Sequence, residues 1–288
     1  MTRREAILRL GSASMGARFA LAQADVNPLG PRLARGAPTS PERMALIDAF
    51  QQQSDGIEKK FEVRAHKSDL AMPYRLFRPE AAGKLPLVMY LHGSGGLGDD
   101  NQKQLGLGNI FGTKVWALPG NQKRFPCYVV APQTDRGWVR YDFSKEPAKV
   151  LPGLGDGGRL ALEIVDRLSR EFPIDERRIY VTGQSMGGAG VWNVIAHRPR
   201  FFAAAVVCCA SASIEDGTEA IDTPLWNFHG DADQTVPVSV SRNRIAARRK
   251  AGGKPLYTEY EGIDHNSWQW AYTEPEMMAW LFAQRRRN

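Results

Sequence analysis

A serine flanked by glycines is the clearest chemical signal in the sequence. The segment IYVTGQSMGG places Ser185 in a G-x-S-x-G pattern, between a short apolar run and a segment of helical character. A serine on such a strand-to-helix turn projects its hydroxyl above a sheet, and the small glycines allow the strained turn to close. A serine that precedes a helix is also a common N-cap. The position between strand and helix favours a nucleophile, and we predict that Ser185 is one.

A serine hydroxyl becomes nucleophilic when a histidine accepts its proton and a buried carboxylate orients that histidine. The segment NFHGDADQTVP offers Asp231 and Asp233, and the segment EGIDHNSW offers His265. We predict that Asp233 is the acid and His265 the base, because Asp264 is too close in sequence to fold back onto the ring. The HGDAD run has no partner cluster of histidines and aspartates elsewhere in the sequence. We therefore expect no metal and no organic cofactor.

Acyl transfer also requires two hydrogen-bond donors for the developing oxyanion. The turn after the serine supplies one, the amide of Met186. The glycine-rich segment LHGSGGLGDDN follows an earlier strand, and we expect the second donor to be the amide of Ser94, with Gly95 as the alternative. A phosphate-binding loop is the competing interpretation, but the segment lacks the G-K-[ST] ending and the G-x-G-x-x-G spacing.

Three residues near these motifs are candidates for the substrate pocket. Trp268 lies three residues after His265, and Trp138 lies in the segment DRGWVRYDF. Either ring could stack against an aromatic or sugar group. For Trp138 the sequence leaves a pocket position and a core position equally open. Gln184, next to the serine, is the third candidate.

Short apolar runs that alternate with helical segments predict how these residues are positioned. Two runs of alternating polarity, FEVRAHK and MPYRLFRP, predict an antiparallel pair at a sheet edge. Continuous apolar runs predict strands at Leu85–His92, Cys127–Gln133, Ile179–Gly183, Ala203–Ala210 and Pro224–Gly230, and Leu256–Gly262 predicts one more. Helices are expected at Asn101–Leu118, Gly158–Glu171, Met186–His197, Val238–Ala251 and Glu274–Arg286. The alternation predicts an α/β fold with a mostly parallel, doubly wound sheet flanked by helices. Ligands bind beyond the carboxyl ends of the strands in such sheets.

The composition is that of an ordinary globular chain. It has 288 residues, 43% of them hydrophobic, and this excludes a disordered or fibrous protein. No uncharged apolar run reaches the roughly 18 residues of a membrane span, so we expect no stable membrane insertion. The net charge is 38 − 31 = +7, but arginines at both ends of the chain supply most of it. The body of the chain is nearly neutral, and we expect no nucleic-acid partner.

The cysteines number three, too few for a disulfide framework, and they lack metal-site spacing. Cys208 and Cys209 lie in the apolar run AAAVVCCA, where small buried core residues are expected. A single bridge from Cys127 to one of this pair stays open if the protein is exported.

The chain resembles an α/β-hydrolase family of predicted peptidases and esterases. This family is related to dienelactone hydrolases, polyhydroxybutyrate depolymerases and feruloyl or acetylxylan esterases. The resemblance extends from about Met72 to the C-terminus and rests on LHGSGG…DN, VVAPQ, RIYVTGQSMGGAGVW, FHGDADQTVPV and YEGIDHNSWQWAYTEPEMMAWLF. It implies the α/β-hydrolase fold, with Ser185, Asp233 and His265 in the chain order nucleophile, acid, base.

The resemblance and the motifs together predict a serine-dependent carboxylic-ester hydrolase that works through an acyl-enzyme. Its expected substrate is a small-molecule or polymer-linked ester, carbohydrate-linked or aromatic in character. Two alternatives stay open. One is a serine peptidase or amidase that uses the same three residues, and the other is a non-catalytic carbohydrate-binding protein on a hydrolase fold. The sequence gives no indication of the oligomeric state.

The first 24 residues predict export. Arg3 and Arg4 precede a weakly apolar stretch that ends in Ala22-Gln23-Ala24, a small-x-small cleavage pattern. Residues 1–24 therefore resemble a twin-arginine signal, which implies a periplasmic or secreted enzyme. The alternative is an amphipathic first helix in a cytoplasmic protein. Residues 25–55 are interpreted as a linker and a short helix at Ala45–Gln53, and residues 56–288 as one catalytic domain.

Overall fold

The computed structural model describes residues 32–33, 39–142, 144, 149–210 and 221–286. The predicted export signal lies outside these residues. In the described part of the chain, the strands are β1 (Arg32–Leu33), β2 (Phe61–Lys67), β3 (Ala71–Phe77), β4 (Leu85–Leu91), β5 (Tyr128–Pro132), β6 (Tyr141–Asp142), β7 (Lys149–Val150), β8 (Ile174–Gln184), β9 (Ala204–Cys208), β10 (Leu225–Gly230) and β11 (Leu256–Tyr260). The α-helices there are α3 (Pro41–Ser54), α4 (Ile110–Lys114), α5 (Pro119–Arg124), α6 (Asp156–Glu171), α7 (Met186–His197), α8 (Ser239–Lys250), α9 (Trp268–Tyr272) and α10 (Pro275–Ala283).

The main sheet is mostly parallel, as the sequence predicts. From β11 to β2, its strands run in the order β11-β10-β9-β8-β4-β5-β3-β2. From β5 to β11 the neighbouring strands pair in parallel, whereas β3 pairs antiparallel with both β5 and β2. The central strands are buried on both faces, which is why they are continuous apolar runs in the sequence.

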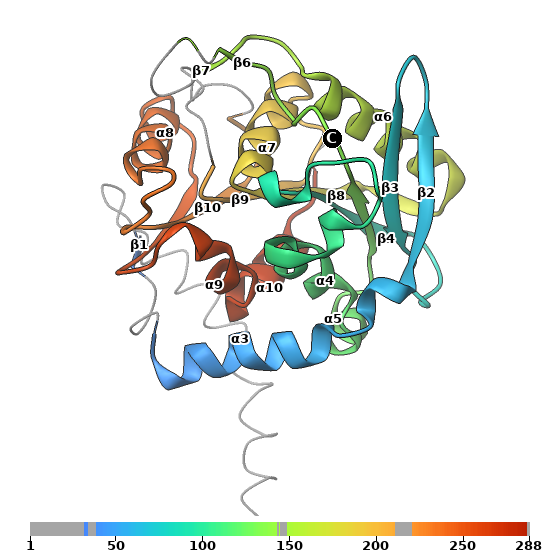
Figure 1. The fold of residues 1–288 in the computed structure, drawn as a ribbon, viewed down its shortest axis with the longest axis horizontal. Coiled ribbons are helices and arrows are strands. Elements are labelled where there is room, and N and C mark those ends of the chain that lie inside the picture. Colours follow the sequence, from blue (N-terminus) through green and yellow to red (C-terminus); the bar gives the residue numbers. More distant parts are fainter. Residues whose placement is uncertain (1–31, 34–38, 143, 145–148, 211–220, 287–288) are drawn as a thin grey trace, which may run out of the picture. The chain divides into compact units, whose positions relative to one another are not determined.

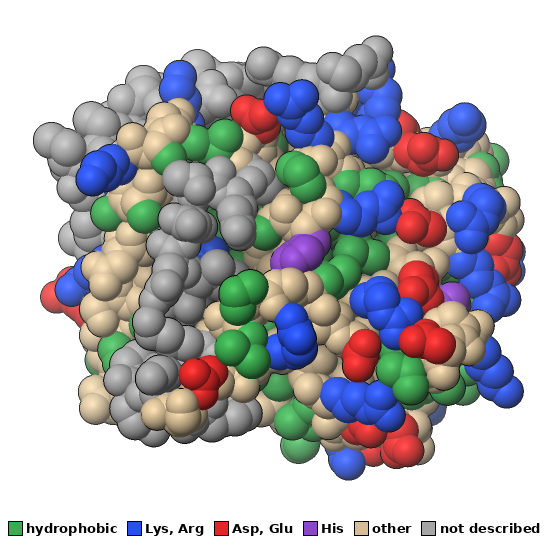
Figure 2. Space-filling model, turned by 90° about the horizontal axis from the view of Figure 1, so that it is seen from above, with side chains coloured by type: hydrophobic (Ala, Val, Ile, Leu, Met, Phe, Trp, Pro, Cys, Tyr) green, Lys and Arg blue, Asp and Glu red, His purple; other side chains and the backbone are tan. Residues whose placement is uncertain are grey.

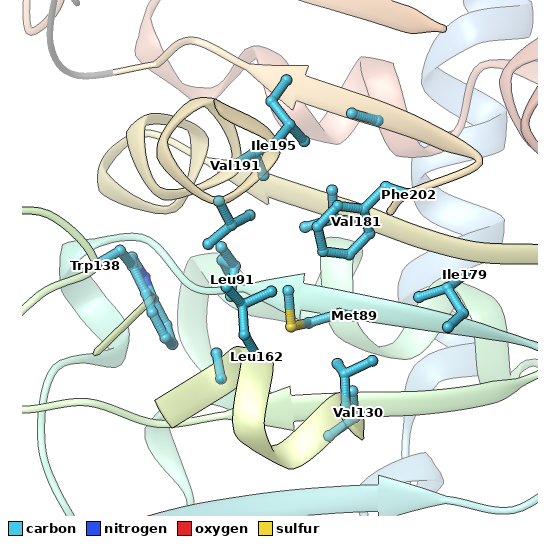
Figure 3. Packing of buried hydrophobic residues seen from close by; sticks show 14 of the residues in the cluster. Met89, Leu91, Val130, Trp138, Leu162, Ile179, Val181, Val191, Ile195 and Phe202 are labelled. Atoms are coloured by element: carbon cyan, nitrogen blue, oxygen red, sulfur yellow. The ribbon is translucent and has the colours of Figure 1, made fainter. Parts of the chain in front are cut away.

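Alternate residues of the central strands enter two hydrophobic cores, one on each face of the sheet. Leu87, Met89 and Leu91 of β4 belong to one core, and Val88 and Tyr90 belong to the other. Helices α6, α7 and α8 cover the first face, and α3, α4, α9 and α10 cover the second (Figure 1). Figure 3 shows the first core, in which strand residues such as Met89 and Val181 lie among helix residues that include Leu162, Val191 and Ile195.

The predicted strands and helices are found with some shifted ends, such as the start of β8 at Ile174, except in one segment that differs in kind. Helix α7 begins and ends where the sequence predicts, and α3 is longer than its predicted core of Ala45–Gln53. The prediction of one helix at Asn101–Leu118 is wrong. This segment consists of short 3₁₀ turns and the five-residue helix α4, because Asn101 and Leu107 have φ values of 55° and 46°, outside the helical region.

The cysteine question left open by the sequence has a definite answer in the structure. Cys127, Cys208 and Cys209 are buried and free, so neither disulfide pairing is present. Within the described ranges, none of the helices has the length and apolar character to cross a membrane.

Candidate active site

Ser185 occupies a sharp turn between β8 and α7. Its backbone angles are φ 53° and ψ −118°, an unusual conformation for a residue with a side chain. The flanking glycines are required because any side chain at these positions would clash with the backbone. A Cβ atom on Gly187 would lie 1.9 Å from the carbonyl oxygen of Leu91, and a Cβ atom on Gly183 would lie 2.5 Å from the carbonyl oxygen of Gly187. The Ser185 amide donates to the carbonyl oxygen of Cys208 at 2.9 Å, which fixes the turn to β9. The G-x-S-x-G pattern therefore has a steric origin.

The structure brings Ser185, His265 and Asp233 together in one hydrogen-bonded chain. The distance from Ser185 Oγ to His265 Nε2 is 2.9 Å, and the distance from His265 Nδ1 to Asp233 Oδ2 is 2.7 Å. An ionised carboxylate can only accept, so Nδ1 carries the proton and Nε2 is left to accept from the serine hydroxyl. The Asp233 side chain is fully buried, whereas that of His265 is 17% exposed. The exposed part of this hydrogen-bonded triad is therefore at His265, and the carboxylate is shielded from solvent.

Four N–H groups surround the Asp233 carboxylate. Oδ1 accepts from the amides of Thr235 and Val236, each at 2.8 Å. Oδ2 accepts from His265 and also from Nε2 of His229, at 3.0 Å. Burial alone raises the pKa of Asp233, but the hydrogen bonds from His229, His265 and the Val236 amide outweigh it and hold that pKa well below its usual range. Asp233 is therefore a stably ionised acceptor.

Two other aspartates join the loops that carry Asp233 and His265. We call residues 231–236 the Asp233 loop and residues 261–267 the His265 loop. Asp231 Oδ1 accepts from the amide of Gly262 at 2.7 Å. Asp264 Oδ1 accepts from the amides of Gln234 and of His265, at 3.0 and 2.6 Å. Both side chains thus join the two loops by hydrogen bonds from backbone amides, whereas Asp233 is the aspartate that bonds the His265 ring.

The glycine-rich loop, residues 92–109, lies beside the serine turn. The β4–β8 register pairs Leu91 with Gly183, and a Cβ atom on Gly93 would lie 3.5 Å from both Cγ and the carbonyl oxygen of Gln184. Ser94–Gly96 form a 3₁₀ turn in which Ser94 and Gly95 are exposed. The first amides of a helical turn have no acceptor within it. The amides of Ser94 and Gly95, and that of Met186 at the start of α7, are therefore free of intrahelical bonds.

His92 supports this loop from inside the protein. Its Nδ1 lies 2.8 Å from the carbonyl oxygen of Gly93, and its Nε2 accepts from the Thr134 amide at 3.2 Å. Burial lowers the pKa of His92 to about 4, so the ring is neutral near neutral pH. A Cβ atom on Gly96 would lie 2.5 Å from the ring, so the loop closes tightly over His92. His92 therefore has a structural role within the glycine-rich loop.

Two residues that hydrogen-bond to the candidate site were missed by the sequence reasoning. The first is His229, which lies in β10 and bonds to Asp233. The second is Asn109, whose Oδ1 accepts from the Gly93 amide at 3.0 Å and faces Tyr90 Oη at 3.0 Å. The HGDAD motif could have indicated His229, because His229 and Asp233 are only four residues apart and the chain turns between them. Asn109 lies in a segment predicted as helix, and no sequence signal marks it.

The three pocket candidates have different environments. Trp138 is fully buried in the core that includes α6 and α7, and its Nε1 donates to the carbonyl oxygen of His92 at 2.8 Å (Figure 3). Its burial favours the core interpretation. Gln184 is also buried, with its amide donating to the carbonyl oxygen of Gly108 at 3.1 Å. Trp268 is partly exposed, and its ring lies edge-on to His265 with centroids 5.4 Å apart. Trp268 is therefore the candidate whose position suits contact with a ligand.

One group among the described residues has the spacing of metal ligands. It consists of Cys209, Asp233 and His265, whose ligand atoms lie within 4.8 Å of one another. Asp231 is not part of the group. The atoms that Asp233 and His265 present to each other are joined by the 2.7 Å hydrogen bond, so a bound ion would have to displace it. The hydrogen-bonded chain and metal binding are alternatives at these atoms.

The face seen in Figure 2 carries basic and acidic side chains intermixed, with Lys and Arg beside Asp and Glu over its right-hand part. A histidine reaches the surface near the middle of this face, between hydrophobic side chains.

The sheet order, the helices on both faces and the serine turn after β8 define the α/β-hydrolase fold. Among solved structures, the chain is similar to a thermostable esterase, with 37% identity, a TM-score of 0.73 and coverage of 80% of this chain and 64% of that chain. A ferulic acid esterase shares the fold, with a TM-score of 0.57 at 16% identity over 77% of this chain and 97% of that one. Among curated proteins, NocK of Nocardia uniformis subsp. tsuyamanensis, provisionally named an esterase, is 26% identical over 201 residues, which are 66% of this chain and 54% of NocK. The chain thus spans less than two thirds of NocK and of the thermostable esterase. No protein-family model matches it.

Proposed function

We propose that the protein is a carboxylic-ester hydrolase with Ser185 as nucleophile, His265 as base and Asp233 as acid. The proposal rests on one observation, the continuous hydrogen-bonded chain from the strained serine turn through His265 to a buried, ionised carboxylate. The similarity to a thermostable esterase at 37% identity supports the ester as the substrate class.

The proposed mechanism gives each step of ester cleavage to one residue or group of this site. His265 Nε2 accepts the hydroxyl proton of Ser185 as Oγ attacks the ester carbonyl carbon. Asp233 stabilises the imidazolium that forms. The amides of Met186 and Ser94, with Gly95 as the alternative to Ser94, donate to the oxyanion of the tetrahedral intermediate. His265 then protonates the leaving alcohol, and water repeats the sequence on the acyl-enzyme to release the acid and free Ser185.

The substrate is proposed to be a small-molecule or polymer-linked ester whose aromatic or sugar group packs against Trp268. The partly exposed ring beside His265 supports this choice. A panel of short-chain, feruloyl, acetylated-xylan and polyester substrates tests it. A Trp268→Ala variant should lose activity on bulky aromatic esters and keep activity on acetate esters.

The Ser185→Ala variant tests the function itself. We expect kcat for a p-nitrophenyl ester to fall on the order of 10⁴-fold or more, because the acyl-enzyme can no longer form. Wild-type protein should also form a covalent adduct on Ser185 with a fluorophosphonate probe. If neither the ester activity nor the adduct is found, the proposal is wrong and a binding protein on a hydrolase fold is the better account.

The same assay separates an esterase from a peptidase or amidase. An aminoacyl anilide offered in parallel with the p-nitrophenyl ester should be cleaved much more slowly, relative to their uncatalysed rates. Preferential cleavage of the anilide would assign the protein to the amidases.

We further propose that residues 1–24 direct export through the twin-arginine route to the periplasm or the medium. The basis is the Arg3–Arg4 pair and the Ala22-Gln23-Ala24 pattern. N-terminal sequencing of protein recovered from the periplasmic fraction and the medium should give Asp25 as the first residue. Protein that begins at Met1 and stays in the cytoplasm would contradict export.

A further inference from the structure

Two histidines share one oxygen of the proposed catalytic acid. Asp233 Oδ2 lies 2.7 Å from His265 Nδ1 and 3.0 Å from His229 Nε2. The side chains of His229 and Asp233 are both fully buried. The sequence reasoning gave His229 no role, and ester cleavage as described above does not use it.

The partners of His229 define which of its nitrogens carries the proton. Nε2 faces two acceptors, Asp233 Oδ2 and the carbonyl oxygen of Val236, each at 3.0 Å, so Nε2 must be the donor. Nδ1 lies 2.7 Å from Ser241 Oγ. Because Ser241 Oγ already accepts from Asn227 Nδ2 at 2.9 Å, its own hydrogen is available to Nδ1. A neutral ring with its proton on Nε2 satisfies every one of these contacts.

We infer that His229 is a positioning residue for the acid, and that Asn227 and Ser241 fix its tautomer. The inference rests on the proposed function, since it concerns how Asp233 acts on His265. The N–H of His229 holds Oδ2 at the position from which it accepts from His265. It also withdraws charge from the carboxylate, so that the proton taken from Ser185 stays on His265, the group that must deliver it to the leaving alcohol.

Backbone bonds alone would leave the acid less constrained. The amides of Thr235 and Val236 bind Oδ1, so the oxygen that faces His265 has His229 as its second donor. Without that donor, the carboxylate could rotate about its bond to the loop, and Oδ2 would carry more negative charge beside the imidazole. The rotation would misalign His265 with Ser185, and the more basic oxygen would draw the proton away from the imidazolium that must deliver it to the leaving alcohol. The surface that receives the substrate would not change.

Three variants test the inference in the full-length protein. His229→Leu removes the donor, His229→Gln can return an N–H near the position of Nε2, and Ser241→Ala removes only the hydroxyl that fixes the tautomer. For a p-nitrophenyl ester, we expect His229→Leu to lower kcat roughly 10- to 100-fold, the range for a lost hydrogen bond to a charged group, with KM within about 2-fold. His229→Gln should recover most of kcat, and Ser241→Ala should show an intermediate loss.

A purely structural role for His229 makes a different prediction. In that case kcat would follow thermal stability, and His229→Gln, which also disturbs the packing of β10, would be as impaired as His229→Leu. Equal losses in the two variants, or full activity in His229→Leu, would overturn the inference. The rate of fluorophosphonate labelling of Ser185 provides a second readout that does not depend on the substrate. A wild-type protein that neither hydrolyses esters nor labels contradicts the proposed function, whereas an active wild type with a fully active His229→Leu variant contradicts the inference alone.

If His229→Leu does not fold, the comparison of Ser241→Ala with wild type decides. Ser241 does not contact Asp233, so a loss of kcat with unchanged KM and unchanged melting temperature can reach the acid only through the His229 tautomer. Wild-type kcat in a folded Ser241→Ala variant would then overturn the inference.

Discussion

We call the part of the site with the proposed acid and base, Asp233 and His265, the acid–base side. The loops that carry these two residues follow two adjacent parallel strands, β10 and β11. These short loops are joined by hydrogen bonds from one to the other, through Asp231 and Asp264. On the other side, the glycine-rich loop is long and irregular, with positive φ at Asn101 and Leu107. Buried amide side chains, including those of Asn109 and Gln133, hold it to the sheet. Strand order thus positions one side, and individual polar side chains position the other.

The difference predicts unequal sensitivity to substitution. On the acid–base side, the backbone geometry persists when a side chain changes, so a substitution should affect chemistry more than structure. On the glycine-rich side, the removal of one buried amide releases a stretch of backbone. Substitutions there should lower the stability of the protein and also disturb the proposed oxyanion donors. Each should lower kcat less than a substitution of Asp233 does.

The largest effect is expected from Asp233→Asn. The amide can present an N–H to His265 Nδ1 and so favour the wrong tautomer of the base, and kcat should fall on the order of 10⁴-fold with little change in melting temperature. Steady-state kinetics on a p-nitrophenyl ester measures this. The matched control is Asp231→Asn, in which the side-chain oxygen can still accept from the Gly262 amide, and we expect kcat/KM within about 3-fold of wild type. A larger loss in Asp231→Asn than in Asp233→Asn would show that the acid is assigned to the wrong residue.

The next effect concerns stability and pH on the glycine-rich side. The pKa of His92 is lowered to about 4 by burial, against about 6.5 for an unfolded histidine. Between these two values the unfolded chain binds a proton that the folded chain does not, so the free energy of unfolding decreases as pH falls from about 6.5 to 4. His92 alone should lower the free energy of unfolding by about 2 kcal/mol at pH 5, relative to pH 7.5.

Urea denaturation of wild type and His92→Gln at pH 7.5 and pH 5 measures the His92 contribution. Glutamine keeps an acceptor for the Thr134 amide and does not titrate, so the variant should lose less stability than wild type on acidification. Equal losses in the two proteins would contradict the assignment of His92 as a buried neutral ring.

The sequence predicts the acid–base side well, and physical reasons explain where it fails. Apolar runs locate β8, β10 and β11. Because the carboxyl ends of parallel strands share one edge of the sheet, the sequence predicts that Ser185, Asp233 and His265 lie close together. The glycine-rich side has no comparable periodicity. Asn109 and Leu107 look like parts of a helix in the sequence, and the positive φ of Leu107 depends on contacts that only the folded chain provides. The burial of Trp138 is likewise decided by the loop path and not by local pattern.

The smallest effect is expected from Asn109→Ala, which removes one side chain of the glycine-rich side and its hydrogen bonds to Gly93, Tyr90 and Lys103. The Gly93 amide and Tyr90 Oη lose an acceptor, but the tyrosine keeps Gln184 Oε1 at 2.9 Å. The peptide before Ser94 becomes freer, so the second oxyanion donor is less well aimed, and kcat should fall roughly 10-fold, less than for complete loss of a donor. Asn121→Ala is the matched control, because it removes an amide that bonds the Val115 carbonyl oxygen, away from this loop. If both variants lose stability but only Asn109→Ala loses kcat, the Asn109 side chain positions the loop for catalysis. If the two variants have equal kcat values, the loop is held by its backbone. The contrast between the acid–base side and the glycine-rich side is then wrong.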